Sequence, residues 1–317
     1  MKRKLFSFFL SLIIFVSFGQ TVSLANNDPE KNSISIAMAT DNNYVLPTIV
    51  AITSMLENAN EDSFYKFYLL ISEDFTKENE EKFLSLENRY KEKCLINFLK
   101  MNNEFSNNIT LPHITSATYF RLRLPGLLQN EEKCLYLDGD IIVLKDLVEL
   151  YNTDITDYYI AGVKEIGVQV FSRKRNEKLD IPDVEKYVNA GILLMNLKKM
   201  RQDNIEQKFN EFIPLLEERN LSLADQDVLN SVCYEKIYNL PFKYNVRANY
   251  FAIMKNNTPS SHLVKQNFTG KEWVEAKKRP VIIHYAVKTK PWNNPTMPYG
   301  DLWCEYARKT DYFKATA

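Results

Sequence analysis

The chain has 317 residues, and its 40 Lys+Arg balance its 40 Asp+Glu to a formal net charge of zero. Apolar residues make up 45% and charged residues 25%, as in ordinary globular proteins, while 12 Pro and 8 Gly are too few for a collagen-like or low-complexity chain. A neutral chain lacks the broad positive surface of nucleic-acid binders, and any site built on imidazole is limited to His113, His262 and His284.

The first 25 residues have the pattern of a secretory signal peptide. Basic residues 2–4 precede an apolar run, Leu5–Phe18, that only three serines interrupt, and residues 23–25 (SLA) offer small side chains at the two positions that a signal peptidase reads. We therefore expect cleavage and export, either to a periplasm or out of the cell. An uncleaved signal anchor in a membrane is the alternative, because the apolar stretch through Leu24 is about twenty residues long. A buried first helix fits the basic flank less well. Residues 26–32 are interpreted as a short linker.

From Ser33 onward, short β-rich segments alternate with longer helical ones. This alternation favours an α/β fold with a mostly parallel sheet and helices on both faces. No internal repeat or linker-like segment follows residue 32, so residues 33–317 are interpreted as a single domain. The pattern predicts strands over residues 33–39, 67–71, 95–99, 133–137, 141–144, 159–163, 192–196 and 281–283, and helices over residues 45–59, 77–91, 119–128, 205–218 and 226–233.

Four cysteines, Cys94, Cys134, Cys233 and Cys304, include no C-x-x-C pair, so the sequence offers no zinc or thioredoxin signature. In an exported protein they could form disulfides in any of three pairings. Four buried thiols are an equally good interpretation, because a free cysteine behaves as a small apolar residue.

An acidic turn, Asp138-Gly139-Asp140, lies between two apolar strands. Strand ends in an open α/β sheet are where ligands bind, and we expect Gly139 to let the backbone turn so that both carboxylates face one point. Two carboxylates at one point suit Mg²⁺, Mn²⁺ or Ca²⁺. The motif alone is equally consistent with a surface turn, since a second Asp-x-Asp, residues 225–227, occurs in the same chain.

Other positions could complete such a site. His284 ends the apolar run 281–283, and an imidazole added to two carboxylates shifts the expected metal towards Mn²⁺, although a histidine in this context is more often structural. Lys290, six residues on, could bind phosphate. Asp41 follows the first strand, where it could cap the next helix or accept hydrogen bonds from a nucleotide. The G-x-G-x-x-G and P-loop motifs are both absent from the sequence.

Together these segments resemble glycosyltransferase family 8, the retaining UDP-sugar transferases, which include bacterial lipopolysaccharide galactosyl- and glucosyltransferases. The resemblance implies the GT-A nucleotide-sugar fold, with a Rossmann-like, mostly parallel central sheet. It covers about residues 33 to 313, and six segments occur in the family's order. The matching text is ATDNNYV (39–45), HITSATYFRLRLPGLL (113–128), KCLYLDGDIIVLKDL (133–147), YVNAGILLMNLKKMR (187–201), ADQDVLN (224–230) and HYAVKTKPWN (284–293).

The resemblance implies a role for each matching residue. Glu165 stands where an acid, often Asp, is usual, and Val287 replaces a glycine that lets the backbone approach the phosphates. Lys290 would bind the diphosphate, with His113 in the same pocket. The uridine would be held by Ala39, Thr40, Asp41, Asn43 and Tyr44, with Tyr44 stacked on uracil. The Mn²⁺ or Mg²⁺ would be bound by Asp138, Asp140 and His284, with Gly139 in the turn, and the donor sugar by Arg121, Asn189, Ala190, Asp225 and Gln226.

The resemblance also implies an enzyme that transfers glucose or galactose, with retention, from a UDP-sugar to a glycan, lipid or protein acceptor. Asp140 would act through the metal, Asp225 would bind sugar hydroxyls, and Gln226 would position the sugar and stabilise positive charge through its carbonyl oxygen. Because an amide is a poor nucleophile, we expect substitution on the face from which UDP leaves rather than a double displacement. The alternative is a secreted, catalytically silent module that binds sugar or nucleotide sugar on the same fold.

Overall fold

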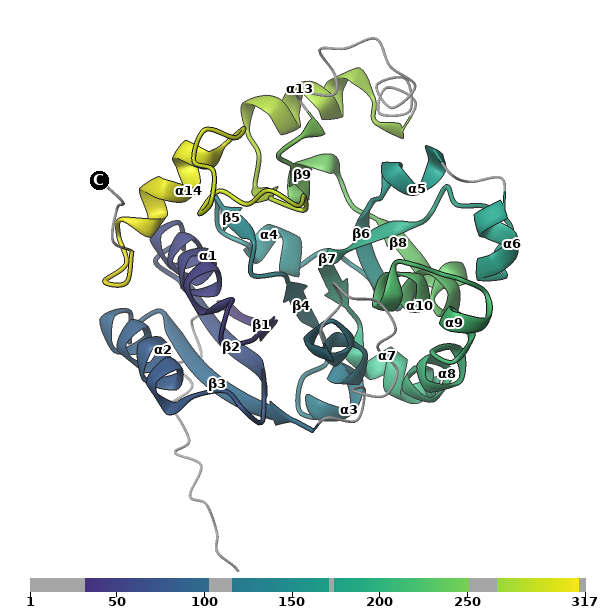
Figure 1. Cartoon of the computed structure of the whole chain (residues 1–317), viewed down its shortest axis with the longest axis horizontal. Helices are drawn as coiled ribbons and strands as arrows, with labels where there is room; N and C mark the ends of the chain where they lie inside the picture. The colour runs from purple at the N-terminus through teal and green to yellow at the C-terminus, as the bar shows by residue number, and fades with distance from the viewer. Residues whose placement is uncertain (1–31, 103–115, 171–173, 251–266, 314–317) are drawn as a thin grey trace, which may run out of the picture. The chain divides into compact units, whose positions relative to one another are not determined.

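A computed structural model of the chain describes residues 32–102, 116–170, 174–250 and 267–313. From Asn32 onward, the described residues form one compact unit (Figure 1). The expected signal peptide and His113 lie outside the described residues. No helix in the described ranges has the length and apolar character needed to cross a membrane.

The centre of this unit is a seven-stranded sheet in the order β3-β2-β1-β4-β7-β6-β8. All of its strands run in the same direction except β7, which is antiparallel to both of its neighbours. The expected α/β fold with a mostly parallel sheet is therefore confirmed. The strands are β1 (Asn32–Thr40), β2 (Ser63–Ser72), β3 (Cys94–Met101), β4 (Cys134–Leu137), β6 (Ile160–Lys164), β7 (Val188–Met195) and β8 (Ile237–Asn239).

Helices cover both faces of this sheet, because successive strand residues point to opposite sides and both sides are apolar. In β1, Ile34, Ile36 and Met38 pack with α1 (Val45–Glu57) and α2 (Lys77–Arg89). Ala37 of β1 faces the other core, as does Tyr136 of β4. That second core is covered by the 3-10 helix η2 (Ser116–Arg123), α3 (Leu124–Leu127), α7 (Leu197–Gln202), α8 (Ile205–Phe212), α9 (Leu215–Glu218) and α10 (Ala224–Val232), of which α7 to α10 are green in Figure 1.

A second sheet, which the sequence did not predict, has the order β5-β10-β9. Its strands are β5 (Ile141–Val143), β10 (Ile282–His284) and β9 (Val246–Arg247). In this sheet β10 is antiparallel to β5 and parallel to β9. The other described elements are α4 (Val148–Tyr151), α5 (Ile166–Val170), α6 (Arg175–Leu179), η4 (Tyr234–Lys236), η5 (Phe242–Tyr244), α13 (Gly270–Lys278) and α14 (Gly300–Ala307).

Three local predictions differ from the structure for identifiable reasons. The helix expected over residues 205–218 is divided into α8 and α9, since Pro214 lacks an N–H and stands at the N-cap of α9. The helix expected over residues 119–128 is divided between the 3-10 helix η2 and the short helix α3, whose first turn contains Pro125. Asp41 does not cap α1, whose N-cap is Tyr44. Its carboxylate instead accepts from the N–H groups of Asn43 (2.8 Å) and Tyr44 (3.0 Å), which closes the preceding turn.

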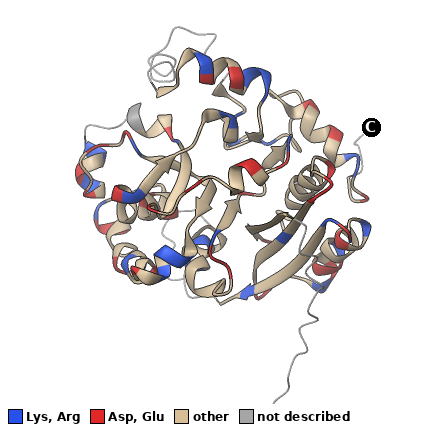
Figure 2. Cartoon of the chain, turned by 180° about the vertical axis from the view of Figure 1, so that it is seen from behind, with Lys and Arg blue, Asp and Glu red and all other residues tan. Residues whose placement is uncertain are grey.

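The structure also shows how the charged residues are distributed and whether the cysteines are paired. Lys/Arg and Asp/Glu are interspersed over the outer helices (Figure 2). All four cysteines are free and buried, so the buried-thiol interpretation holds in this structure.

One buried side chain fixes α10 against β7. Asn230 of α10 accepts from the Val188 N–H (2.7 Å) and donates to the Val188 carbonyl (2.9 Å) and to the Gln226 carbonyl (2.8 Å). The amide thus satisfies both backbone groups of Val188, as a neighbouring strand would. This junction sets the position of the first turn of α10 relative to the start of β7.

We predict that Asn230→Ala lowers the free energy of unfolding by about 2–4 kcal/mol, because two buried backbone groups lose their partner at about 1–3 kcal/mol each. Urea unfolding measures the change, and Asn152→Ala, at an exposed position, is the matched control. A loss no larger than that of the control would contradict this account of the junction.

Candidate active site

The acidic motif lies at the carboxyl end of β4, in the turn that leads to β5. The Asp138 N–H donates to the Gly191 carbonyl of β7 (2.8 Å), which ties the start of the turn to the central sheet. The Tyr285 N–H donates to the Asp140 carbonyl (2.9 Å), which ties its end to the second sheet. Because β10 pairs with β5, His284 lies opposite Ile141 and next to the turn.

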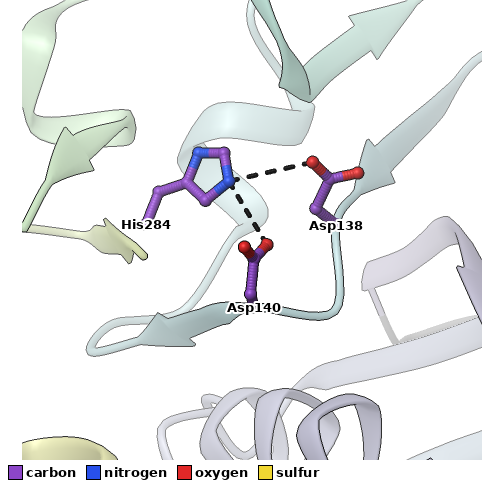
Figure 3. A group of neighbouring side chains, drawn as sticks. All are labelled: Asp138, Asp140 and His284. Carbon is purple, nitrogen blue, oxygen red and sulfur yellow. Dashed lines mark ion pairs between the residues drawn. The ribbon is translucent and has the colours of Figure 1, made fainter. Parts of the chain in front are cut away.

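The imidazole of His284 faces both carboxylates (Figure 3). Its Nε2 lies 3.3 Å from Asp140 Oδ1 and 3.7 Å from Asp138 Oδ2. Within the part of the chain that the structure describes, these three residues form the only cluster of His, Cys, Asp or Glu that could share one ion. Two carboxylate oxygens and an imidazole nitrogen within 4.8 Å of one another fit Mn²⁺ or Mg²⁺. The side chain of Asp138 is 28% exposed, so the group is open on one side.

Two neighbouring side chains keep the buried acid of this group charged. Burial raises the pKa of Asp140, but the nearby His284 ring and Lys290 ammonium hold it well below its usual range. Lys290 donates to Asp140 Oδ2 and to the Tyr285 carbonyl (2.9 Å). Lys290, expected on the diphosphate, is thus bound to a candidate metal ligand in this structure.

Arg121 joins the acidic turn to α10. Its guanidinium lies 3.1 Å from Asp138 Oδ1 and 2.9 Å from Asp225 Oδ2, and it donates to the Ala190 carbonyl (2.6 Å). It also stacks on the Tyr136 ring, 4.1 Å from its centroid. Burial outweighs the nearby Arg121 and, with the charge of Asp138, raises the pKa of Asp225 to about 7.

The second Asp-x-Asp is not a second metal site. Whereas Asp225 pairs with Arg121, the buried carboxylate of Asp227 accepts from Arg175 (2.7 Å) and from the Tyr187 hydroxyl (2.7 Å). Each acid of this motif therefore has its own arginine, and the two do not converge.

The side chain of Gln226 is hydrogen-bonded to the start of β7. Its Oε1 accepts from the Ala190 N–H (3.0 Å) and the Asn189 side chain (3.2 Å). We expected this oxygen to face positive charge on a sugar. It could do so only by giving up one of the two hydrogen bonds that it accepts. Asn189 also donates to Glu165 (3.1 Å), and Glu165 forms an ion pair with Arg247 (2.6 Å), a residue that the sequence did not single out.

A cavity of about 250 Å³ opens beside the acidic turn. Tyr44 lies in its wall, with Trp292 packed edge-on at 5.6 Å between ring centroids. Burial and the negative charge of Asp140 raise the pKa of Tyr44. Asn43, expected in the uridine pocket, is exposed and does not line the cavity. The lining residues are Ala39, Thr40, Asp41, Tyr44, Ala117, Thr118, Arg121, Tyr136, Asp138, Gly139 and Asp140.

A larger hollow of about 700 Å³ lies at the other end of β4, among residues that include Lys133, Tyr151 and Asn196. It does not contain the candidate metal-binding cluster. The chemistry of the smaller cavity, rather than its size, identifies it as the candidate site.

Two glycines make room at the site. Gly139 does not adopt a positive φ, so our expectation that the turn needs its freedom was wrong. A Cβ there would instead lie 2.6 Å from Thr48 Oγ1 of α1. At Gly191 a Cβ would lie 2.6 Å from Asp138 Oδ2 and would overlap His284 Cε1. Sequence reasoning missed Gly191, whose signal was the small residues at the start of an otherwise apolar strand.

Val287 does not disturb this region. Its N–H donates to the Tyr285 carbonyl (2.7 Å), and its φ lies outside the left-handed region. A valine is therefore accommodated without backbone strain at this position.

We predict that Gly191→Ala lowers Mn²⁺ affinity at least about tenfold although every ligand remains, because the new methyl group displaces His284 or Asp138. Electron paramagnetic resonance of free Mn²⁺ measures the change in the presence of UDP. Gly270→Ala is the matched control, since a Cβ there meets nothing within 4 Å. Equal Mn²⁺ affinity in the two variants would contradict the prediction.

Comparison with known proteins agrees with this geometry. Residues 35–296 match the family description "Glycosyl transferase family 8". The chain is 31% identical over 285 residues to General stress protein A of Bacillus subtilis (strain 168), covering 87% of this chain and 94% of the relative. It is 27% identical over 298 residues to a lipopolysaccharide 1,2-glucosyltransferase of Escherichia coli, covering 90% of this chain and 78% of the relative.

Among solved structures, the galactosyltransferase LgtC in complex with donor and acceptor sugar analogs matches with a TM-score of 0.73 at 25% identity, covering 89% of this chain and 98% of LgtC. The central sheet with its flanking helices is accordingly the GT-A fold. The chain belongs to glycosyl transferase family 8.

Proposed function

We propose that this protein is a metal-dependent, retaining transferase that moves glucose or galactose from a UDP-sugar to a glycan, lipid or protein acceptor. The observation that carries the proposal is the convergence of Asp138, Asp140 and His284 on one point at the wall of the cavity that contains Asp41 and Tyr44. It is supported by the similarity to LgtC, crystallised with donor and acceptor sugar analogs, and to a lipopolysaccharide 1,2-glucosyltransferase.

The cavity offers groups suited to a nucleoside diphosphate. A Mn²⁺ or Mg²⁺ held by Asp138, Asp140 and His284 would act as a Lewis acid on the departing diphosphate. Lys290 adds fixed positive charge beside the same point, where negative charge develops as the sugar leaves. The Tyr44 ring in the cavity wall suits stacking on a base, which contributes about 1–3 kcal/mol.

The groups that are engaged bear on the route by which the proposed retention would be achieved. Asp225 is held by Arg121, and Gln226 by Ala190 and Asn189. Neither side chain is presented as a free nucleophile for a double displacement of the kind used by retaining glycosidases. We therefore propose that the acceptor hydroxyl enters on the face from which UDP departs and gives its proton to the departing phosphate. Gln226 then acts by holding the first residues of β7 in place.

We predict that Asp140→Asn lowers kcat at least about 100-fold, since charge stabilisation by the metal contributes several kcal/mol to the transition state. UDP release from UDP-glucose and UDP-galactose, with Mn²⁺ and with a chelator, measures the effect. Asp154→Asn, which changes an exposed acid, should keep wild-type activity. Full activity of Asp140→Asn, or of the wild type in chelator, would overturn the metal dependence.

We predict that the first-formed product from an α-linked donor is α-linked, because the acceptor enters on the face that UDP leaves. The anomeric proton signal in NMR spectra of the early reaction distinguishes the two products. A β-linked first product would refute retention and the same-face substitution together.

A further inference from the structure

We propose that Asn245 is a positioning residue that, together with Asn189, fixes the tautomer of His284 and couples the metal ligands to Gln226. The inference rests on the proposed function, because it concerns the ligand set assigned there. Asn245 precedes β9 and is 2% exposed. Its side chain lies between the His284 ring (3.1 Å from Nδ1) and the Asn189 side chain (2.9 Å).

Two neighbouring groups set the direction of these hydrogen bonds, because one can only accept and the other can only donate. The Glu165 carboxylate, paired with Arg247 at 2.6 and 2.9 Å, only accepts. The Gly191 N–H only donates, and it lies 3.1 Å from the Asn189 side chain. Asn189 must therefore direct its NH₂ to Glu165 and its carbonyl oxygen to Gly191.

The orientation of Asn189 determines that of Asn245. The Asn245 side chain contacts the Asn189 oxygen at 2.9 Å. Because that oxygen accepts, the Asn245 group at this contact must be its NH₂. The carbonyl oxygen of Asn245 is then the group that faces His284 Nδ1. An amide oxygen cannot donate, so Nδ1 must carry a proton.

The Nδ1 proton matters because the surroundings of Nε2 favour the opposite tautomer, with the proton on Nε2. Nε2 faces the carboxylates of Asp138 and Asp140, and a proton on Nε2 would donate to Asp140 at 3.3 Å. Such a proton would occupy the position that a metal needs. By accepting a hydrogen bond from Nδ1–H, Asn245 holds the proton on Nδ1 and leaves the Nε2 lone pair for the ion, as outer partners of metal-bound histidines commonly do.

The same amides reach the sugar side of the site. Asn189 donates to Gln226 Oε1 as well as to Glu165, and Gln226 lies next to Asp225 in the first turn of α10. A change of orientation at Asn245 would therefore be transmitted to Gln226. A purely local support for His284 would not have this effect.

The tautomer can be measured in the unmodified protein. The chain has three histidines, so ¹⁵N-histidine labelling gives three imidazole spin systems, and His284→Gln assigns the one of interest. We expect Nδ1 of His284 to be protonated both without metal and with Mg²⁺ and UDP. An unprotonated Nδ1 in either state would overturn the proposal. This NMR measurement requires neither enzyme activity nor a variant of Asn245.

Two variants distinguish a relay, in which Asn245 links His284 to Gln226 through Asn189, from a role limited to supporting His284. Asn245→Leu removes both hydrogen bonds and should weaken Mn²⁺ binding in the presence of UDP about 10- to 100-fold. Asn245→Asp still accepts from Nδ1 but offers Asn189 no donor. We expect it to hold Mn²⁺ within a few-fold of wild type while kcat falls about tenfold or more.

The control is Asn58→Leu, which removes a partly buried asparagine bonded to Ser54, Val143 and Tyr306, and it should leave Mn²⁺ affinity unchanged. Wild-type Mn²⁺ affinity in Asn245→Leu, or wild-type kcat in Asn245→Asp, would refute the relay. Failure of the wild type to bind Mn²⁺ at all would instead count against the metal dependence of the proposed function.

Discussion

Mutual repulsion among three converging acceptors is the constraint around which this site is arranged. The carboxylates of Asp138 and Asp140 and the Nε2 of His284 meet within 4.8 Å, and two of the three side chains are almost fully buried. Charges this close in a low-dielectric interior destabilise the fold unless positive charge offsets them. Lys290 and Arg121 supply part of that charge from the protein, and a divalent cation would supply the rest.

Three adjacent residues of β7 contact this site from both faces of the sheet. Asn189 and Gly191 face Asn245 and His284, while Ala190 between them belongs to the other core, with α10 and η2. The backbone of Ala190 bonds to both Gln226 and Arg121. Because successive strand residues alternate in direction, three adjacent residues can contact the candidate metal ligands on one side and α10 and η2 on the other.

Much of this could be predicted from the sequence. The strand–helix alternation gave the sheet type, and Asp138, Asp140 and His284 stand at strand ends, where side chains converge. What could not be predicted depends on long-range pairing. β9 has two residues and no periodic pattern, so neither Asn245, which precedes it, nor Arg247 within it carried a signal. Gly191 is recognisable only once the strand is placed against His284, and the true reason for Gly139 is the approach of Thr48 from α1.

The measurement that tests the central claim most directly is anomalous diffraction at the manganese edge from crystals grown with Mn²⁺ and UDP. The account predicts one strong peak between the carboxylates of Asp138 and Asp140 and Nε2 of His284, with the diphosphate density in contact with it and the uracil beside Tyr44. A peak bound by other residues, or ordered UDP without a peak at these three side chains, would contradict it.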